Sequence, residues 1–406
     1  MAENPQSYVT VKQLWQTPYI KGVYSELATP SMMLSKMFGV MEKRELAPAR
    51  VFGWDQFNLT RTVATMKAPM TAPSTIRRQR VATKTGALLR VAEKLHIYDE
   101  EIAHLRPLGQ PIGTMDQRGE AWFTRQVKNM TQRHRNLIEY ATSKAIQGGF
   151  GIARSGEMYY ITELNAPGNE FDIDMFQVEN DSGCRARHTG DLGGIIDTDW
   201  SDPGADIVGQ LMKLRQRQLV EYGEVCPIAI TDSRTLAYMM NNVSLSQIAG
   251  SANRVWQSWD GNVSPVGVEP SSRNIGSQAI VFSAIPDYRW IAYDNVVSLG
   301  TSSDPQGSDS FTVDGVNRII PAGHVIFTPE PSEEWFTVYE GEEPVRQNWQ
   351  SDATMMRGFG AWNFPLPQHP PGREANMIDN FLPVIRLPRA IWNATVRPTD
   401  AHDIVT

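Results

Sequence analysis

Four aspartates stand close together in the stretch "IDTDWSDPGAD": Asp197, Asp199, Asp202 and Asp206. Carboxylates are preferred ligands of hard cations, so this stretch is the best candidate for metal-dependent chemistry. Its spacing does not match a calcium-binding loop, and its glycine is misplaced. Asp202 suits the N-cap of a helix and Asp206 its first turn, where an acid interacts favourably with the helix dipole. A structural role is therefore favoured, and a metal-dependent α/β enzyme using Asp197 and Asp199 stays as an alternative.

Two smaller groups give weaker signals. Asp172 and Asp174 in "FDIDMF" alternate with apolar residues, which predicts a strand with one solvated face. His188 follows Cys184 in "CRARH", but two residues do not make a metal site. Neither group predicts catalysis.

Motifs for common chemistry are missing from the sequence. It has no Walker loop, no HExxH, no GxSxG and no Cys/His ligand cluster, so no cofactor, metal or catalytic site is expected. The net charge of −7 argues against wholesale wrapping of nucleic acid. No apolar run approaches the roughly 18 residues of a membrane span, and no signal peptide is recognised. The two cysteines fit a reducing compartment.

A long basic hairpin is predicted between residues 50 and 95. "RVFGWDQFNLTRTVATM" and "RQRVATKTGALLRVAEK" have strand character, and the Pro-rich "APMTAPST" between them forbids helix. The hairpin carries many cations and few acids: Arg61, Lys67, Arg77, Arg78, Arg80, Lys84, Arg90 and Lys94. Because an isolated two-stranded hairpin is marginally stable in water, it needs a partner surface. A solvated ribbon is the alternative, but an intermolecular contact explains its charge and length better.

A helix of roughly 30 residues is predicted from about Asp116, its candidate N-cap, to the Gly148–Gly149 pair. Apolar residues recur at helical spacing: Phe123, Val127, Met130, Leu137, Ile138, Ala141, Ala145 and Ile146. Such a helix is about 45 Å long, so it must lie across a sheet. Its basic residues are expected to face outward: Arg125, Lys128, Arg133, Arg135 and Lys144.

Shorter elements flank this helix. Apolar residues after Pro30 predict a short helix in an N-terminal arm that docks elsewhere. "EMYYITELNAPGNEFDIDMF" predicts a strand, a Pro-Gly turn and a second strand, which would supply the sheet.

A second α/β region is predicted from about residue 200 to 300. A helix would begin near Pro203 with Asp202 or Ser201 as its cap, followed by the central strand "PIAITD" and the helix "SRTLAYMMNNVSL". "FTVDGVNRIIPAGHVIF" predicts a hairpin with an Asp314–Gly315 turn. "NFLPVIRLPRAIWNATV" predicts a closing strand pair.

The order of these elements resembles the major capsid proteins of tailed bacteriophages, and in particular the family of the lambda major head protein E. The similarity runs from about residue 30 to 396. It rests on the order of four stretches: "RHRNLIEYATSKAIQGGFGI", "WSDPGADI" through "CPIAITDSRTLAYMMNN", "VDGVNRIIPAGHVIF" and "NFLPVIRLPRAIWNATV". None of them is a catalytic signature.

The resemblance implies an α+β fold of the Hong Kong 97 type. It implies an N-terminal arm (1–48), an extended hairpin loop (49–95), a peripheral domain with a spine helix (96–204), an axial domain (205–375) and C-terminal strands returning to the peripheral domain (376–406). The function implied is that of a structural major capsid protein, not an enzyme, in the icosahedral shell around double-stranded DNA. The expected location is the virion, after assembly in the host cytoplasm. A bacterial nanocompartment shell of the same fold is the main alternative.

The resemblance also implies partners, and the distribution of charge indicates contact residues. The partners would be other copies in pentamers and hexamers, packaged DNA through nonspecific contacts, and scaffold, portal and decoration proteins. Contacts between subunits would use the hairpin residues Arg77, Arg78, Arg80, Lys84 and Arg90. The side facing DNA would use the helix residues Arg125, Lys128, Arg133 and Arg135.

Overall fold

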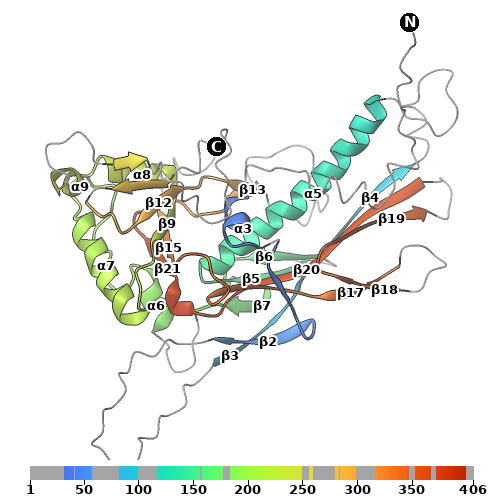
Figure 1. The fold of residues 1–406 in the computed structure, drawn as a ribbon, viewed down its shortest axis with the longest axis horizontal. Coiled ribbons are helices and arrows are strands. Elements are labelled where there is room, and N and C mark those ends of the chain that lie inside the picture. Colours follow the sequence, from blue (N-terminus) through green and yellow to red (C-terminus); the bar gives the residue numbers. More distant parts are fainter. Residues whose placement is uncertain are drawn as a thin grey trace, which may run out of the picture.

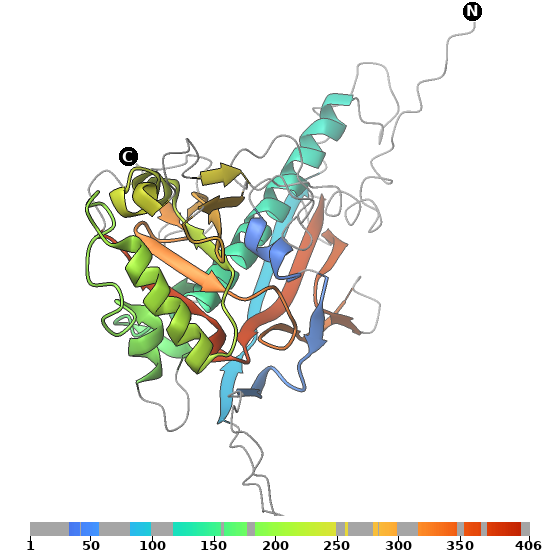
Figure 2. The ribbon, with the colours of Figure 1, turned by 60° about the vertical axis from the view of Figure 1, so that its left-hand side comes forward.

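The structure is a computed structural model in which two parts can be distinguished (Figure 1). It describes residues 32–40, 42–56, 82–98, 117–155, 158–176, 183–248, 256–258, 279–282, 284–298, 316–346, 353–366 and 372–398. A compact part gathers the helices between residues 184 and 248 around a sheet. An elongated part follows the long helix α5 (Gln117–Ile146) and the strands β4 (Leu89–Tyr98) and β20 (Gly372–Ile385). Figure 2 shows the same arrangement after a 60° turn, with α5 again beside β4 and β20.

The elongated part is built on a five-stranded sheet. Its strands are β1 (Arg44–Leu46), β4 (Leu89–Tyr98), β16 (Phe336–Glu340), β19 (Gly360–Leu366) and β20 (Gly372–Ile385). The longest strand, β20, pairs in antiparallel fashion with β4, β16 and β19. Because β4 and β19 both pair with the first half of β20, they lie on opposite sides of it.

The long helix is α5 (Gln117–Ile146), and the predicted helix is thereby confirmed. Val127, Met130, Ile138 and most other members of its apolar stripe are buried. The helix ends where the two glycines take positive φ, 117° at Gly148 and 124° at Gly149. A Cβ at Gly149 would collide with the carbonyl oxygen of Ile173, so the chain needs glycine there. Asp116 lies outside the described residues.

A three-stranded sheet follows α5. Its strands are β5 (Gly149–Ser155), β6 (Met158–Thr162) and β7 (Asn169–Asp174), in the order β6-β5-β7. The two strands predicted after the helix are present, but β5 lies between them. The physical reason is that β5 buries Phe150 and Ile152 and therefore takes the central position.

The compact part contains a seven-stranded sheet. Its order is β10 (Trp256–Ser258), β11 (Ala279–Phe282), β12 (Arg289–Ala292), β9 (Ile228–Thr231), β15 (His324–Thr328), β21 (Trp392–Thr395) and β8 (Thr189–Gly190). The helices of this part are α6 (Cys184–His188), α7 (Ile207–Glu221), α8 (Ser233–Met240) and α9 (Val243–Ile248). All four residues of β9 are buried, which confirms the predicted central strand. The helices in the described part of the chain are all too short or too polar to span a membrane.

The remaining elements are small. They are the helix α3 (Met33–Met37), the 3-10 helix η3 (Pro388–Ala390) and the strand pairs β2 (Val51–Gln56) with β3 (Ala82–Ala87), β13 (Val296–Ser298) with β14 (Val316–Arg318), and β17 (Glu342–Val345) with β18 (Thr354–Arg357).

The C-terminal half corrects two predictions. The closing strands β20 and β21 do not pair with each other, because η3 begins at Pro388 between them and they enter different sheets. In the predicted hairpin, β14 pairs with β13, whereas β15 pairs with β9 and β21. The Asp314–Gly315 turn lies outside the described residues.

The two sheets do not divide at residues 205 and 375. Strands β16 and β19 fall between these positions but join β4 and β20 in the five-stranded sheet. Strand β21 falls after residue 375 but joins the sheet of the compact part.

Candidate assembly surfaces

The root of the basic hairpin is fixed firmly to the body of the subunit. Strands β2 and β3 pair over all six residues, from Val51 opposite Ala87 to Gln56 opposite Ala82. Phe52, Trp54 and Gln56 form the buried face of β2. The Gln56 side-chain amide donates to the carbonyl oxygens of Met175 at 3.0 Å and Ile385 at 3.2 Å. The described part of the hairpin is therefore a rigid base.

The predicted contact residues of the hairpin fall in three different settings. Arg77, Arg78 and Arg80 lie outside the described residues. Lys84 is half-buried on β3, and desolvation lowers the pKa of its ammonium group while Asp174 opposes the shift.

Arg90 is on β4 instead of the hairpin. Its guanidinium donates to the Glu343 carboxylate, with Nε at 2.8 Å and Nη2 at 2.5 Å from Oε1. This hydrogen bond raises the pKa of Arg90. Arg90 is thus already engaged within its own subunit.

The basic residues of α5 do not all face outward. Arg125 and Lys128 are exposed, and Arg133 is exposed and lies 3.2 Å from Glu93. Arg135 and Lys144 are buried, so the outward orientation predicted for these two is wrong.

Lys144 is buried because the last turn of α5 packs against the body of the subunit. Its ammonium group forms an ion pair with Glu163 and lies 5.4 Å from the centre of the Tyr140 ring. A long side chain can bury its aliphatic stem while the charge keeps a partner.

A buried carboxylate on α5 holds the N-terminal helix. Glu139 accepts hydrogen bonds from the backbone N–H groups of Leu34 and Ser35, both at 2.8 Å. It also accepts from Ser35 Oγ at 2.5 Å and from the Tyr293 hydroxyl at 2.7 Å. Burial raises the pKa of Glu139, and these donors oppose the shift.

Helix α3 therefore docks on its own subunit. Leu34 and Val40 are fully buried, so the prediction that this segment docks elsewhere is wrong for residues 32–48. The sequence signal for this anchor was an acid next to Ile138 in the apolar stripe of α5.

A second buried carboxylate, Asp379 on β20, joins three elements. Arg44 of β1 donates to both of its oxygens, at 2.7 and 3.0 Å, and Nε2 of His134 on α5 lies 3.2 Å away. Burial alone would raise the pKa of Asp379, but the contacts with His134 and Arg44 outweigh it and lower that pKa.

Asp232 has the same role in the compact part. It caps α8 by accepting from the Thr235 N–H at 3.0 Å, and it accepts from the Gly323 N–H at 3.0 Å. The Arg397 guanidinium donates to it at 2.9 Å, so the end of the described chain is fastened to the start of α8. Burial would raise the pKa of Asp232, but these donors lower it.

The acidic stretch folds as turns and a helix cap. Asp199 accepts from the Ser201 N–H at 2.8 Å, and Asp202 accepts from the Gly204 N–H at 2.8 Å. The N-cap of α7 is Asp206, whose side chain accepts from Gly209 N–H at 2.9 Å, so the prediction of Asp202 or Ser201 as the cap is wrong. Asp206 is the N-cap because α7 begins at Ile207, after the turn that contains Pro203.

Asp197 also has protein partners, the Gln210 amide at 2.8 Å and the Lys213 ammonium group at 3.4 Å. Among the residues that the structure describes, no group of three or more His, Cys, Asp and Glu side chains is arranged to hold a metal ion.

His188 is a core residue. Its Nδ1 lies 2.9 Å from the Ile391 carbonyl oxygen, its Nε2 lies 3.1 Å from Glu221, and its ring stacks on Trp392 at 3.9 Å. Neither Cys184 nor Cys226 forms a disulfide, and both are buried.

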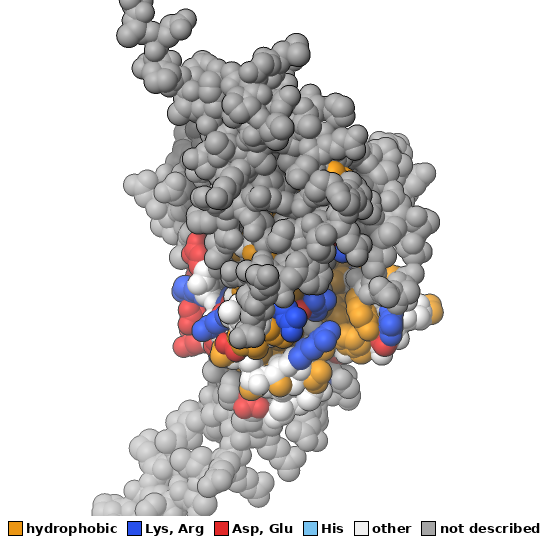
Figure 3. Space-filling model, turned by 90° about the vertical axis from the view of Figure 1, so that its right-hand side faces the viewer, with side chains coloured by type: hydrophobic (Ala, Val, Ile, Leu, Met, Phe, Trp, Pro, Cys, Tyr) orange, Lys and Arg blue, Asp and Glu red, His pale blue; other side chains and the backbone are white. Residues whose placement is uncertain are grey.

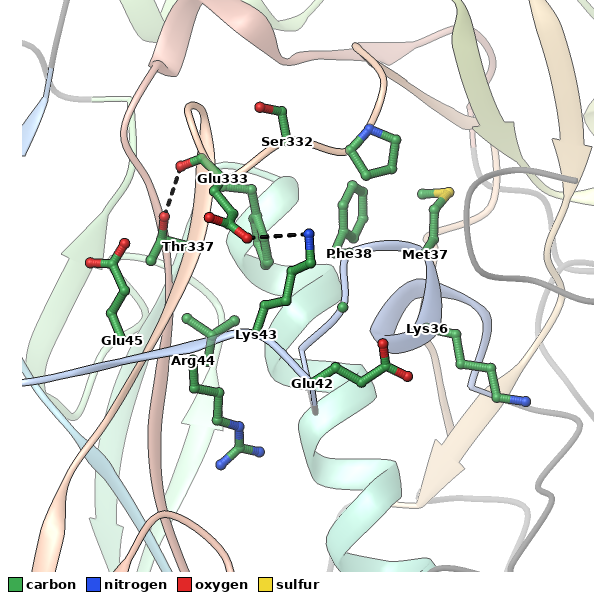
Figure 4. A pocket seen from close by; sticks show the side chains of 14 residues that line it. Lys36, Met37, Phe38, Glu42, Lys43, Arg44, Glu45, Ser332, Glu333 and Thr337 are labelled. Carbon is green, nitrogen blue, oxygen red and sulfur yellow. Dashed lines mark hydrogen bonds and ion pairs between the residues drawn. The ribbon is translucent and has the colours of Figure 1, made fainter. Parts of the chain in front are cut away.

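A surface cavity of about 310 Å³ lies between the chain after α3 and strand β16 (Figure 4). Four of the charged side chains that line it have a partner close by. Lys43 lies 3.2 Å from Glu333, and the Thr337 hydroxyl donates to the Glu333 carbonyl oxygen at 3.0 Å. Arg44 is bound to Asp379, and Glu45 contacts Arg386 at 2.5 Å. This balance of charge gives the cavity no marked preference for a charged ligand.

Comparison with solved structures defines the class of fold. A structure assigned as a prophage capsid protein from E. coli CFT073 aligns with a TM-score of 0.54 at 12% identity, covering 94% of this chain and 99% of that one. A phage-related protein from Bordetella bronchiseptica RB50 aligns at 0.43 with 11% identity, covering 96% and 98%. An encapsulin complex from Synechococcus elongatus PCC 7942 aligns at 0.40 with 11% identity, covering 93% and 95%. The last two scores are too low to support an argument, but the first shows that this chain shares the mixed α+β fold of the E. coli CFT073 protein.

The sequence also resembles a known family over part of its length. Residues 21–192, less than half of the chain, match the family of phage major capsid protein E. No curated protein sequence matches the chain.

Proposed function

We propose that this chain is the subunit from which the icosahedral shell of a phage head is built, and that the shell encloses double-stranded DNA. The match of residues 21–192 to the major capsid protein E family carries this proposal. The candidate catalytic residues agree with this proposal. Asp199 forms a turn, Asp206 caps α7 and His188 packs in the core, so each of them has a structural role.

The parts of the subunit would have separate roles in the shell. The hairpin that begins with β2 and β3 would be the extended loop that contacts a neighbouring copy. Helix α5 would be the spine of the peripheral domain. The seven-stranded sheet with α7, α8 and α9 would form most of the axial domain. The rigid root of the hairpin supports the first role, since a contact between subunits needs a fixed base.

The basic outer face of α5 would face the packaged DNA. Arg125, Lys128 and Arg133 are exposed there, whereas Arg135 is buried and drops out of the predicted set. Contacts of this kind would be made with phosphates, without sequence preference.

Negative-stain electron microscopy of the purified protein tests the function. Closed shells, or rings of five or six copies, are expected, with scaffold protein supplied if the subunit needs it. Reversing Arg77, Arg78 and Arg80 to Glu should weaken assembly and leave the circular dichroism spectrum unchanged. The matched control reverses Arg125 and Lys128, which should leave shells intact but reduce the DNA they retain.

Two outcomes would overturn parts of this picture. Normal shells from the triple hairpin variant would exclude its arginines as subunit contacts. Shells filled with a protein cargo and free of DNA would support the nanocompartment alternative.

A further inference from the structure

A pocket lies where the base of the hairpin meets the body of the subunit, and we call it the hairpin-base pocket. It has a volume of about 620 Å³. Its lining comes from β2, β3, β7 and α6 and is mostly polar, including Trp54, Lys84, Asp172, Asp174 and Arg185. Because polar groups dominate this lining, their hydrogen bonds indicate what kind of ligand the pocket can bind.

The two carboxylates of the pocket already have donors within their own subunit. Asp174 Oδ1 accepts from the Phe176 N–H at 2.9 Å and from Nη2 of Arg185 at 2.6 Å. Asp172 Oδ1 accepts from the Asn165 N–H at 2.9 Å and from a side-chain amide at 2.7 Å. The negative charge of the lining is therefore compensated by hydrogen bonds inside the subunit.

Two N–H donors of the lining have no acceptor among the described residues: Nε1 of Trp54 and Nε of Arg185. Both atoms are buried, and Trp54 as a whole is only 3% exposed. A buried donor without an acceptor is unfavourable, and most buried donors in proteins have a partner. The free hydrogen-bonding capacity of the pocket thus consists of donors, which suit a ligand rich in acceptor oxygens.

The orientation of the Trp54 ring directs its N–H toward the pocket. A Cβ at Gly86 would lie 2.9 Å from Cζ3 of Trp54, so this end of the ring packs against Gly86. Nε1 is at the opposite end of an indole from Cζ3, so the N–H is directed away from Gly86. The β3 residues that line the pocket are Thr83, Lys84 and Thr85, on the other side of the ring from Gly86.

Lys84 brings a positive charge to the same face of the hairpin. It pairs directly with Trp54 across the two strands, and directly opposed residues place their Cβ atoms about 5 Å apart on one face. Its ammonium group is half-buried, and desolvation lowers its pKa, so a nearby anion would stabilise its charged form. On the side of the molecule shown in Figure 3, Lys and Arg side chains stand among Asp and Glu, so no extended basic patch of the described surface competes there for an anion.

We propose that the hairpin-base pocket binds a small oxyanion, a phosphate or carboxylate group, between the Trp54 N–H, the Arg185 Nε–H and the Lys84 ammonium group. Hydrogen bonds from charged donors to such a group are among the strongest in proteins. The ligand would join the base of the hairpin to β7 and α6 and would stabilise this junction. The site is formed within one subunit, so it does not depend on the proposed function.

Acetylation of Lys84 measures occupancy of the pocket in the intact chain. The full-length protein is treated with N-hydroxysuccinimidyl acetate at constant pH, in sodium phosphate or in sodium chloride of equal ionic strength, and mass spectrometry follows each lysine. Because a bound anion keeps the ammonium group charged and covers it, acetylation of Lys84 should fall about fivefold or more in phosphate. The side chains of Lys94 and Lys213 are 61% and 60% exposed, and these two lysines should react equally in both salts.

Two substitutions test whether the indole N–H takes part. Trp54→Phe removes the N–H but keeps an aromatic ring, so about tenfold more phosphate should be needed to protect Lys84 equally. Trp290→Phe is the matched control, because Trp290 also has a buried N–H without an acceptor among the described residues but lies in the core of the compact part. The control should leave the phosphate dependence unchanged, and an equal loss in both variants would overturn the role of Trp54.

Further salts and assembled particles distinguish the sources of the oxyanion. Sodium acetate tests a carboxylate in place of phosphate, and protection of Lys84 by either anion supports the site. Equal acetylation of Lys84 in phosphate, acetate and chloride would overturn the proposal. Protection of Lys84 in assembled particles in chloride, with neither anion effective on the free subunit, would also overturn it, because the acceptor would then be an acidic side chain of another subunit. None of these outcomes removes the support for the proposed function.

Discussion

The interior of the compact part is packed with aromatic rings, whereas the elongated part buries polar side chains beneath α5. Around Trp290, the rings of Trp200, Phe282, Tyr288 and Phe327 lie within 6.3 Å, mostly edge to face. Helix α5 instead buries seven polar or charged residues: Thr131, His134, Arg135, Glu139, Thr142, Ser143 and Lys144.

The two parts differ in what surrounds their central elements. The elongated part has an apolar core of its own, which includes Ile138, Trp335 and Phe381. In addition, Glu139 and Asp379 join segments that are far apart in the chain, such as α3 with α5 and β1 with β20. We therefore expect loss of a single polar anchor to have a large effect in the elongated part. In the compact part we expect a large effect from loss of the aromatic core, although Asp232 is a polar anchor there too.

The largest effect is expected at Glu139. Glu139→Ala leaves four buried donors without an acceptor, and the free energy of unfolding should fall by about 3–5 kcal/mol. Because α3 would lose its attachment, trypsin should cleave at Lys36 and Lys43 much faster than in the wild type. Urea denaturation and timed proteolysis measure the two effects.

Glu139→Gln is the control for this substitution. It keeps an acceptor oxygen in place, so it should cost clearly less, about 1–2 kcal/mol. If Ala and Gln were equally damaging, or if α3 stayed resistant to trypsin in the Ala variant, the anchoring role of the carboxylate would be refuted.

A somewhat smaller effect is expected in the aromatic core. Trp290→Leu keeps part of the buried volume, so it should cost about 2 kcal/mol, below the 3–5 kcal/mol typical of truncation to Ala. The near-ultraviolet circular dichroism should weaken, and α3 should remain protected from trypsin. Release of α3 in this variant would show that the two parts do not lose stability separately.

Acid should destabilise the protein by protonating buried carboxylates whose pKa is lowered in the folded state, such as Asp379. Asp379 is ionised and stabilising above its unfolded pKa, about 3.9, and this contribution is lost as pH falls through its lower folded pKa. The wild type should therefore lose stability in that window. In Asp379→Asn the loss should be shallower, starting from a lower stability. Urea midpoints measured from pH 5 to pH 2.5 compare the slopes, and equal slopes would exclude Asp379 as the source.

Regular periodicity was enough to predict several elements. The spacing of apolar residues in α5, its glycine stop and the central strand β9 all follow from local sequence. The hairpin root follows from strand character and prolines. Contacts between distant segments were not predictable, because nothing local indicates that Glu139 will meet Leu34 or that Gln56 will meet Ile385. The same limit explains why β20 and β21 were paired in the prediction although they belong to different sheets.

Candidate contact residues were predicted from charge alone, and charge does not reveal which cations find partners inside the subunit. Lys144 and Arg135 lie in the same helix as Arg125 and Lys128, yet the body of the subunit covers the first two and leaves the others exposed. Their burial depends on elements more distant in sequence than any helical pattern can show.

The smallest change in stability is expected for the ion pair of Arg90 with Glu343. This pair tests whether burial is the reason why the polar contacts of Glu139 and Asp379 stabilise the fold. The side chain of Arg90 is 47% exposed and that of Glu343 is 19% exposed. A partly solvated pair contributes about 0–1 kcal/mol, because water screens the attraction and ordering the side chains costs entropy. A double-mutant cycle with Arg90→Ala and Glu343→Gln should therefore give a coupling free energy below about 1 kcal/mol. A coupling as large as that expected for the buried anchors would mean that geometry outweighs burial. In that case the contrast between the two parts would have to be explained by the number of polar contacts and not by their depth.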